Sequence, residues 1–223
     1  MRLLQHIVSA LVLCGLAAFA SATSANPQNG IDYLTLPSPQ HTDAGNKVEV
    51  IEFFAYYCPH CDAFEPILAQ WVKKQGDKVV FKRVHVPYNE RTIPQQRLFY
   101  TLEAMGLTEK YHSQVFKAMH VERLQLSRDE MVFDWIEKVG IDRTRFIDTY
   151  RSFGVQAKVR RADAMMEPYG INKWPMIIVD GKYQTSPSQA SEGAPPPQTE
   201  AQQHQLALQV MDYLVARAAT QKK

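Results

Sequence analysis

The apolar pattern between residues 48 and 86 predicts a strand, a helix and a second strand. Residues 48–54 are apolar except for two glutamates, which is typical of a central strand buried on both faces. Apolar side chains from Phe64 to Val72 then recur at the three- and four-residue spacing of one helix face. Residues 79–86 alternate as a strand does. A strand–helix–strand unit of this length has parallel strands and a right-handed crossover.

The middle of the chain has a helical pattern and shows no strand signal from residue 88 to residue 161. Thr108 is expected to cap the second of these helices, and Ser127 with Glu130 resembles a capping box before the third. The predicted helices cover residues 94–105, the stretch that follows Thr108, residues 131–139, residues 143–153 and residues 155–169. Because amphipathic helices can cover one another, an all-helical insertion is expected here.

The strand pattern returns near the end of the chain. Residues 176–179 form an apolar strand, and Asp180-Gly181 after it is a strong two-residue hairpin turn. A loop rich in Pro, Ser and Gly covers residues 184–198, and the pattern assigns it no role. Residues 200–219 close the chain as an amphipathic helix. The whole pattern is that of an α/β protein whose sheet is interrupted by helices.

Composition and charge narrow the class of protein. The chain has 223 residues, of which 45% are hydrophobic and 22% are charged, an ordinary globular composition. This length allows one domain with an insertion, or two small domains. The net charge is +2 and the basic residues are dispersed, so a nucleic-acid partner is not indicated.

Residues 1–25 have the pattern of a signal peptide. A positive residue precedes the apolar stretch 7–20, and small side chains place the cleavage after Ala22 or Ala25. The apolar stretch is short for a membrane span, and the bulky residue before Cys14 argues against a lipoprotein. Cleavage would leave two cysteines in an exported chain. Export implies an oxidising compartment, and a bacterial periplasm is expected.

The two remaining cysteines lie where the strand at 48–54 gives way to the helix. Pro59 suits the first helical position, which places Cys58 at the helix N-terminus and Cys61 one turn later on the same side. Free N–H groups and the helix dipole favour an anion there, so the pKa of Cys58 should fall. His60 can add positive charge or a hydrogen-bond donor. A stabilised thiolate leaves readily, so a disulfide between the two cysteines should be reactive.

Two other interpretations of the cysteine pair are possible. A disulfide that closes so short a loop removes little entropy from the unfolded chain, about 2 kcal/mol, so a structural staple is a weak explanation. A zinc site needs four ligands, and the chain has no second cysteine pair. His60 and His85 are scattered and are weak evidence for a metal. Redox chemistry is therefore the favoured interpretation, and no metal is expected.

Glu52 is unusual because it lies in the buried strand before the cysteines. A buried carboxylate costs on the order of several kcal/mol unless it is paired or protonated. It can act as a proton acceptor or electrostatic tuner beneath Cys61. Alternatively, it reaches solvent or pairs with Lys82 or Arg83 on the neighbouring strand.

With these features in view, the chain resembles the thiol:disulfide interchange proteins of the DsbA type. These have a thioredoxin fold with a helical domain inserted between its βα and ββα parts. The resemblance rests on Glu52-Phe53-Phe54, Cys58-Pro59-His60-Cys61, the helical stretch, and Pro175 with Val179-Asp180-Gly181-Lys182-Tyr183. It implies a thioredoxin-like fold with an inserted all-helical domain. Residues 26–88 and 166–223 would be the thioredoxin-like parts, and residues 89–165 the insertion.

The resemblance also implies roles for single residues. Cys58 would be the exposed nucleophile and Cys61 its buried partner, with His60 stabilising the Cys58 thiolate. Pro175 would be a cis-proline facing the disulfide. Trp174 would offer backbone groups to an extended substrate, although it is bulkier than the residue usual there. Glu52 would match the buried acid below the pair.

The expected activity is that of a protein-dithiol oxidase in the periplasm. Its substrates would be unfolded or reduced exported proteins, and its only redox group the Cys58–Cys61 disulfide. The resemblance implies reoxidation by a quinone-linked membrane partner, and the protein is expected to be a monomer. The alternatives are a disulfide isomerase or reductase, and a non-catalytic chaperone on the same fold.

Overall fold

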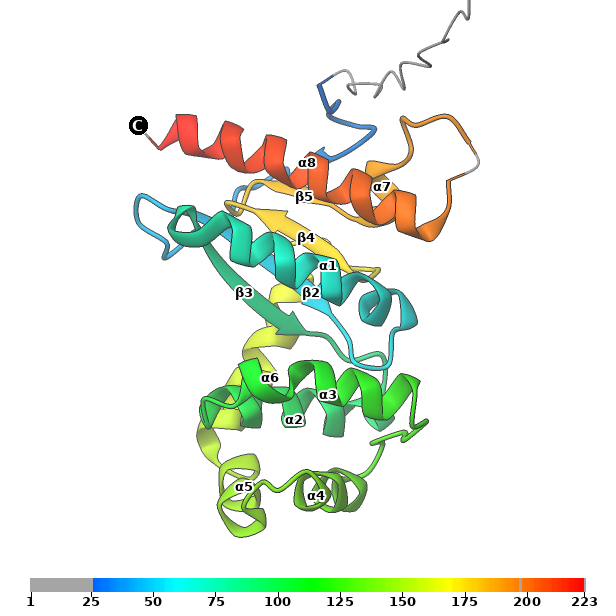
Figure 1. The fold of residues 1–223 in the computed structure, drawn as a ribbon. Helices are drawn as coiled ribbons and strands as arrows, with labels where there is room; N and C mark the ends of the chain where they lie inside the picture. Colours follow the sequence, from blue (N-terminus) through cyan, green and yellow to red (C-terminus); the bar gives the residue numbers. More distant parts are fainter. Residues whose placement is uncertain (1–25, 197, 223) are drawn as a thin grey trace, which may run out of the picture.

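The structure is a computed structural model, and it describes residues 26–196 and 198–222. The predicted signal peptide lies outside the described residues. These residues contain a five-stranded sheet in the order β1-β5-β4-β2-β3 (Figure 1). The strands are β1 Leu34–Thr35, β2 Val48–Phe54, β3 Val79–His85, β4 Met176–Val179 and β5 Tyr183–Thr185. The predicted strands at 48–54 and 176–179 are confirmed.

The central strand β2 is buried along its whole length, as its apolar sequence predicts. It pairs in parallel with β3, where Glu52 lies opposite Arg83. It pairs antiparallel with β4, where Phe53 lies opposite Met176. The helix α1, Pro59–Gln75, connects β2 to β3, so the predicted strand–helix–strand unit is confirmed.

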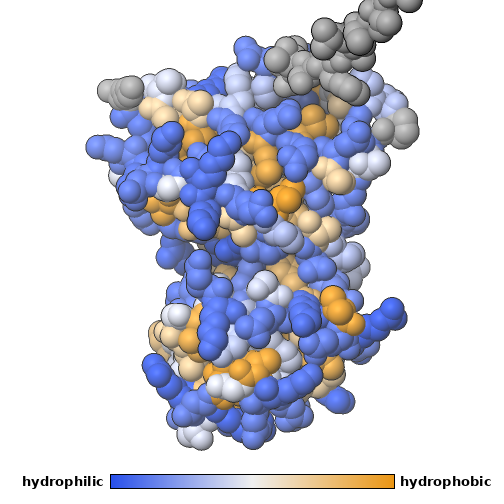
Figure 2. Space-filling view, viewed as in Figure 1, coloured by the Kyte–Doolittle hydropathy of each residue, from blue (hydrophilic) through white to orange (hydrophobic). Residues whose placement is uncertain are grey.

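The helices form two groups (Figure 1). One group lies against the sheet, and the other forms a separate layer. On one face, α1 and α8 pack in a cluster with Val48, Val50, Phe64 and Leu214. The helices between β3 and β4 form the other layer, and Figure 2 shows the molecule narrowing between the two parts. The helices other than α1 are η1 Gly76–Lys78, η2 Glu90–Thr92, α2 Ile93–Ala104, α3 Thr108–His120, α4 Asp129–Lys138, α5 Arg143–Tyr150, α6 Phe153–Met166, α7 Pro187–Ala190 and α8 Glu200–Gln221.

Several predicted helix ends are wrong. Thr108 is the first residue of α3, and Leu107 is the cap because its N–H already bonds back to Leu102 of α2. The predicted capping box before α4 is also absent from the described chain, where Arg128 is the cap and the Ser127 hydroxyl donates to the Met131 sulfur.

A second set of helix ends differs by a few residues. Helix α5 ends at Tyr150 and α6 begins at Phe153, because the Ser152 side chain caps α6 by accepting the Val155 N–H at 3.3 Å. Helix α6 ends at Met166, earlier than predicted. Tertiary packing fixes these ends, and the helical pattern alone does not.

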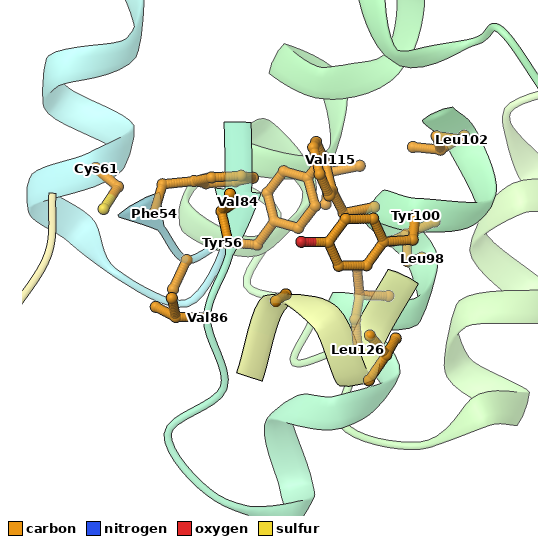
Figure 3. Close-up of a cluster of buried hydrophobic side chains, with 14 of the residues drawn as sticks. Phe54, Tyr56, Cys61, Val84, Val86, Leu98, Tyr100, Leu102, Val115 and Leu126 are labelled. Atoms are coloured by element: carbon orange, nitrogen blue, oxygen red, sulfur yellow. The ribbon is translucent and has the colours of Figure 1, made fainter. Parts of the chain in front are cut away.

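A continuous apolar cluster joins the cysteine motif to the helical layer. Figure 3 shows Phe54 and Tyr56 with Cys61 on one side and Val115 of α3 on the other. The Phe54 ring meets the Tyr56 ring edge to face at a centroid distance of 5.2 Å. Because protein interiors are close-packed, the packing of the helical layer helps to fix the position of the motif.

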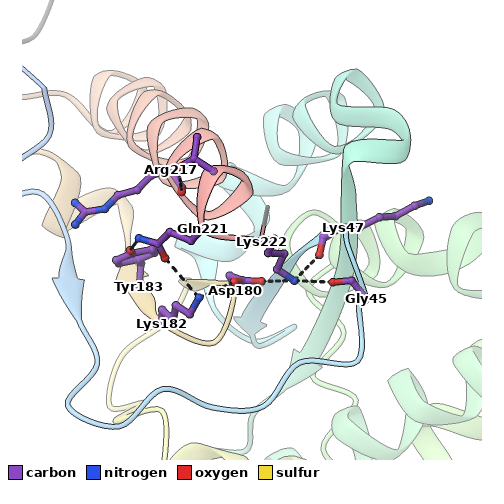
Figure 4. Close-up of polar contacts among 9 residues, drawn as sticks. Gly45, Lys47, Asp180, Lys182, Tyr183, Arg217, Gln221 and Lys222 are labelled. Carbon is purple, nitrogen blue, oxygen red and sulfur yellow. Dashed lines mark hydrogen bonds and ion pairs between the residues drawn. The ribbon is translucent and has the colours of Figure 1, made fainter.

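The hairpin after β4 is confirmed. Asp180 and Gly181 both have positive φ, 53° and 61°, as a tight hairpin turn requires, and Lys182 N–H bonds Val179 O at 3.0 Å. Lys222, just after α8, pairs with Asp180 at 2.7 Å and donates to Lys47 O at 2.7 Å (Figure 4). These contacts hold the end of α8 against the sheet.

Candidate active site

The motif has the geometry that its sequence predicts. Cys58 is the cap of α1, with φ −87° and ψ 117°, and Pro59 is the first helical residue. Cys61 lies one turn along, and Asp62 N–H bonds Cys58 O at 3.2 Å. Both cysteines are free thiols in this structure.

The two cysteines differ in exposure less than expected. Cys61 has no exposed surface and Cys58 only 6%. The expectation of an exposed Cys58 is therefore wrong in degree, because the chain around Trp174 lies over it. Cys58 Sγ, as a thiol, donates to the Trp174 carbonyl oxygen at 3.7 Å. Of the pair, Cys58 is still the one with surface open to solvent.

The two thiols differ strongly in acidity. A hydrogen bond from the Cys61 thiol lowers the pKa of Cys58 to about 6, despite the opposing effect of burial. The backbone N–H groups of Cys61 and His60 and the charge of His60 act in the same direction. Burial first, and then the hydrogen bond and charge of Cys58, raise the pKa of Cys61 well above its usual range. At neutral pH one sulfur is an anion and the other a thiol.

His60 is held from outside its own helix. Its Nδ1 lies 2.6 Å from Oε1 of Glu200, the first residue of α8. This hydrogen bond, and then the Cys58 charge, raise the pKa of His60 although partial burial opposes the rise. Glu200 was not found in the sequence analysis. It lies 140 residues away in the chain, so no local pattern indicates the contact.

Trp174 and Pro175 lie beside Cys58, and the peptide bond between them is cis. The Trp174 carbonyl faces Cys58, as the contact above shows. The Trp174 ring meets the Tyr57 ring edge to face at 6.0 Å and Tyr88 at 6.5 Å. Tyr88 is 72% exposed, so an aromatic surface borders the cysteine pair.

Glu52 is buried and paired, with only 1% of its surface exposed. Arg83 Nε donates to its Oε2 at 3.1 Å, and the Arg83 fork also binds Glu65 of α1 at 2.8 Å. Burial raises the pKa of Glu52 to about 8, and Arg83 opposes that rise. The charge of Glu52 acts in turn on Cys61. Of the possible partners, Arg83 is the one observed, and Lys82 pairs with Glu49 at 2.6 Å instead.

Further polar side chains extend this buried cluster, and no local sequence pattern indicates their contacts. Glu65 lies 3.4 Å from His112 of α3. The Tyr56 hydroxyl lies 2.9 Å from Nδ1 of His112, and the Tyr56 backbone N–H donates to Nε2 of His85 at 3.1 Å. The helix of the motif, the sheet and the helical layer thus share one polar cluster.

Residues 26–196 and 198–222 hold no group of three or more His, Cys, Asp or Glu side chains placed to bind a metal ion. None of the helices in the same residues has the length and apolar character to cross a membrane.

A strand–helix junction with two close cysteines, next to a cis-proline on a mixed sheet, defines a thioredoxin-fold thiol:disulfide oxidoreductase. Comparison with known proteins agrees. The family model described as "DSBA-like thioredoxin domain" matches residues 84–203, and the model "Thioredoxin" matches residues 40–99. The chain therefore belongs to the DsbA-like thioredoxin family.

Individual relatives support this assignment. "Thiol:disulfide interchange protein DsbA" of Burkholderia cepacia is 40% identical, over 83% of this chain and 89% of that one. The protein of the same name from Pseudomonas aeruginosa PAO1 is 32% identical over 98% of this chain and 100% of its own. The crystal structure of Pseudomonas aeruginosa DsbA matches with a TM-score of 0.79 at 31% identity, covering 88% and 97% of the two chains.

These findings confirm three predictions: the thioredoxin-like fold with a helical insertion, the class of thiol:disulfide oxidoreductase, and the function of a protein-dithiol oxidase.

Proposed function

We propose that Cys58 and Cys61 form the redox-active disulfide of this oxidase and that Cys58 is the sulfur that substrates attack. A substrate thiolate attacks Cys58 Sγ, the bond to Cys61 breaks, and Cys61 takes up a proton. A second substrate thiolate then attacks the substrate sulfur of the mixed disulfide and releases Cys58 as a thiolate. The substrate loses two electrons as its disulfide forms, and the protein gains them.

The observation that carries this proposal is the opposite shift of the two pKa values. The pKa of Cys58 falls to about 6, so Cys58 is a good leaving group at neutral pH. The pKa of Cys61 rises, so the Cys61 sulfur takes up a proton once the disulfide is broken and stays a thiol. Stabilising the reduced form in this way makes the disulfide oxidising.

The surrounding residues support separate parts of the chemistry. Pro59 starts the helix whose N–H groups face Cys58, and His60 supplies charge beside it. Glu52, with its pKa raised to about 8 by burial, can exchange the proton that Cys61 gains and loses. Trp174 and Pro175 lie beside Cys58, where an extended substrate would lie.

The cellular setting follows from family membership and from the N-terminal sequence. The protein would act in the periplasm on reduced or unfolded exported proteins, as a monomer, after loss of residues 1–25. A quinone-linked membrane oxidase would restore its disulfide. Residues 26–88 and 166–223 would carry the redox site, and residues 89–165 would form the inserted helical domain.

The equilibrium with glutathione tests the direction of the activity. An oxidase is expected to oxidise reduced glutathione readily, because the Cys58 thiolate stabilises its reduced form. A potential near that of thioredoxin, about −270 mV, would favour the isomerase or reductase alternative instead.

Replacing Cys58→Ser tests the site itself. The variant should lose oxidation of a reduced test protein completely, because no disulfide can form. Unchanged turnover would contradict the assigned site. Far-ultraviolet circular dichroism of the variant controls for folding, and a folded, inactive variant supports a redox role over a non-catalytic chaperone.

A further inference from the structure

The stretch before α8 contains the short helix α7, although its composition predicts only a loop. Ser186 caps α7 by accepting the Gln189 N–H at 3.1 Å, and the Gln189 side chain donates to the Ile31 carbonyl oxygen. Thr199 and Gln202 form a capping box at the start of α8. This capping box fixes where α8 begins, and Glu200 is its first residue.

That first residue meets the redox motif. Glu200 Oε1 lies 2.6 Å from Nδ1 of His60 and 3.8 Å from Nε2 of His204. His204 is 5% exposed, and its ring packs on the Phe64 ring of α1 at a centroid distance of 5.1 Å, so α8 is held against the motif helix. The contact thus links the start of α8 to His60, one of the two residues between the cysteines.

We infer that Glu200 is a positioning residue of the redox site, which holds the His60 ring and its positive charge beside Cys58. The inference deepens the proposed function, since it concerns the same sulfur. The charged groups acting on His60 are Glu200 from α8 and Cys58 from the start of α1, and His204 contacts Glu200 from the next turn of α8.

The balance of charges gives the direction of the effect. Glu200 raises the pKa of His60 by accepting its hydrogen bond. A His60 cation in turn lowers the pKa of Cys58. The carboxylate itself repels the thiolate, but Glu200 reaches Cys58 through His60, and the nearer cation outweighs the more distant anion. Glu200 therefore stabilises the thiolate indirectly.

A purely structural role of Glu200 predicts something different. An acidic residue in the first turn of a helix stabilises that helix through its dipole, whatever lies next to it. Such a role would change the stability of α8 and would leave the titration of Cys58 unchanged. The test must therefore read out the sulfur and the imidazole, in addition to stability.

The test is Glu200→Gln in the full mature chain, with Glu109→Gln as the matched control. Glu109 is an exposed acidic residue in the first turn of α3, so the control removes the same charge from a similar position. His60 is titrated by NMR and Cys58 by thiolate absorbance. In Glu200→Gln we expect the pKa of His60 to fall and the acidity constant of Cys58 to drop about twofold, the size typical of exposed charge pairs. Glu109→Gln should change neither.

Two further results complete the test. The equilibrium constant for oxidising glutathione should fall by about the same factor in Glu200→Gln. In a His60→Ala background, Glu200→Gln should no longer move Cys58. If the pKa of Cys58 is low in the wild type and the same in Glu200→Gln, the inference about Glu200 is wrong and the proposed function stands. The inference is also wrong if Glu200→Gln lowers the pKa of Cys58, or if Glu200→Gln still shifts that pKa in the His60→Ala background. A wild-type Cys58 that titrates like free cysteine overturns the proposed function.

Discussion

Two acid–base pairs lie near the cysteines and differ chiefly in burial. Below Cys61, the side chains of Glu52 and Arg83 are 1% and 18% exposed. Beside Cys58, the side chains of His60 and Glu200 are 69% and 47% exposed. Both pairs have short contacts, of 3.1 Å and 2.6 Å. The chemistry is similar, so the difference in environment decides what each pair does.

Because the inner pair, Glu52 and Arg83, is buried, it should act mainly on the stability of the fold. Because the outer pair, His60 and Glu200, is exposed, it should act mainly on the pKa of Cys58. Charges removed from water depend on their partner, and loss of one partner leaves an uncompensated charge in the interior. Charges in water are screened and interact weakly. The inner pair should therefore dominate unfolding experiments, and the outer pair should be visible mainly in the titration of Cys58.

The largest expected effect comes from breaking the inner pair. Arg83→Met leaves the Glu65 carboxylate buried without its cation and Glu52 without its hydrogen-bond donor. This should cost about 3–5 kcal/mol of the free energy of unfolding. Urea denaturation of the reduced protein measures it. Lys158→Met is the control, because it breaks the exposed 2.5 Å pair with Glu103 and should cost about 1 kcal/mol or less. Equal losses in both variants would contradict the comparison.

The next effect is a change in pH dependence. The pKa of Glu52 rises from 4.5 to about 8 on folding, so between these values the folded chain binds more protons than the unfolded chain. The contribution of Glu52 to the free energy of unfolding is therefore fully present below pH 4.5 and is lost as the pH rises towards 8. Glu52→Gln should remove that loss. Unfolding at pH 5 and pH 8 should show a larger gain for the variant at pH 8.

An equal effect of Glu52→Gln at both pH values would mean that the carboxyl stays ionised throughout. Glu109→Gln, on the surface, serves as the control and should shift stability little at either pH.

The smallest expected effect is on the stability of the outer pair. Glu200→Gln should change the free energy of unfolding by about 0.5 kcal/mol or less, because both partners face water. Urea denaturation beside Arg83→Met measures the contrast. A loss of several kcal/mol, on the order expected for a buried pair, would show that Glu200 is primarily a structural residue of α8.

The sequence predicted what depends on local pattern. The buried strand β2, the start of α1 at Pro59 and the hairpin at Asp180 follow from side-chain period and turn chemistry. The helical insertion was predicted for the same reason, and the cis bond before Pro175 through the family resemblance.

The partners of the site could not be predicted, because they come from distant parts of the chain. Arg83 was one of two possible partners for Glu52, and only the register of β2 with β3 selects it. His112 reaches Glu65 because α3 packs against α1. Glu200 reaches His60 because the Thr199–Gln202 capping box starts α8 at that point beside the motif. Packing between elements decides each of these contacts.

The most direct test of the account is a titration of Cys58 in the reduced protein, followed by thiolate absorbance. The account predicts a transition centred near pH 6, with Cys61 still protonated well above that range. A single transition near the ordinary cysteine value of about 8.5 would contradict it, because the disulfide would then lack the stabilised leaving group on which its oxidising power depends.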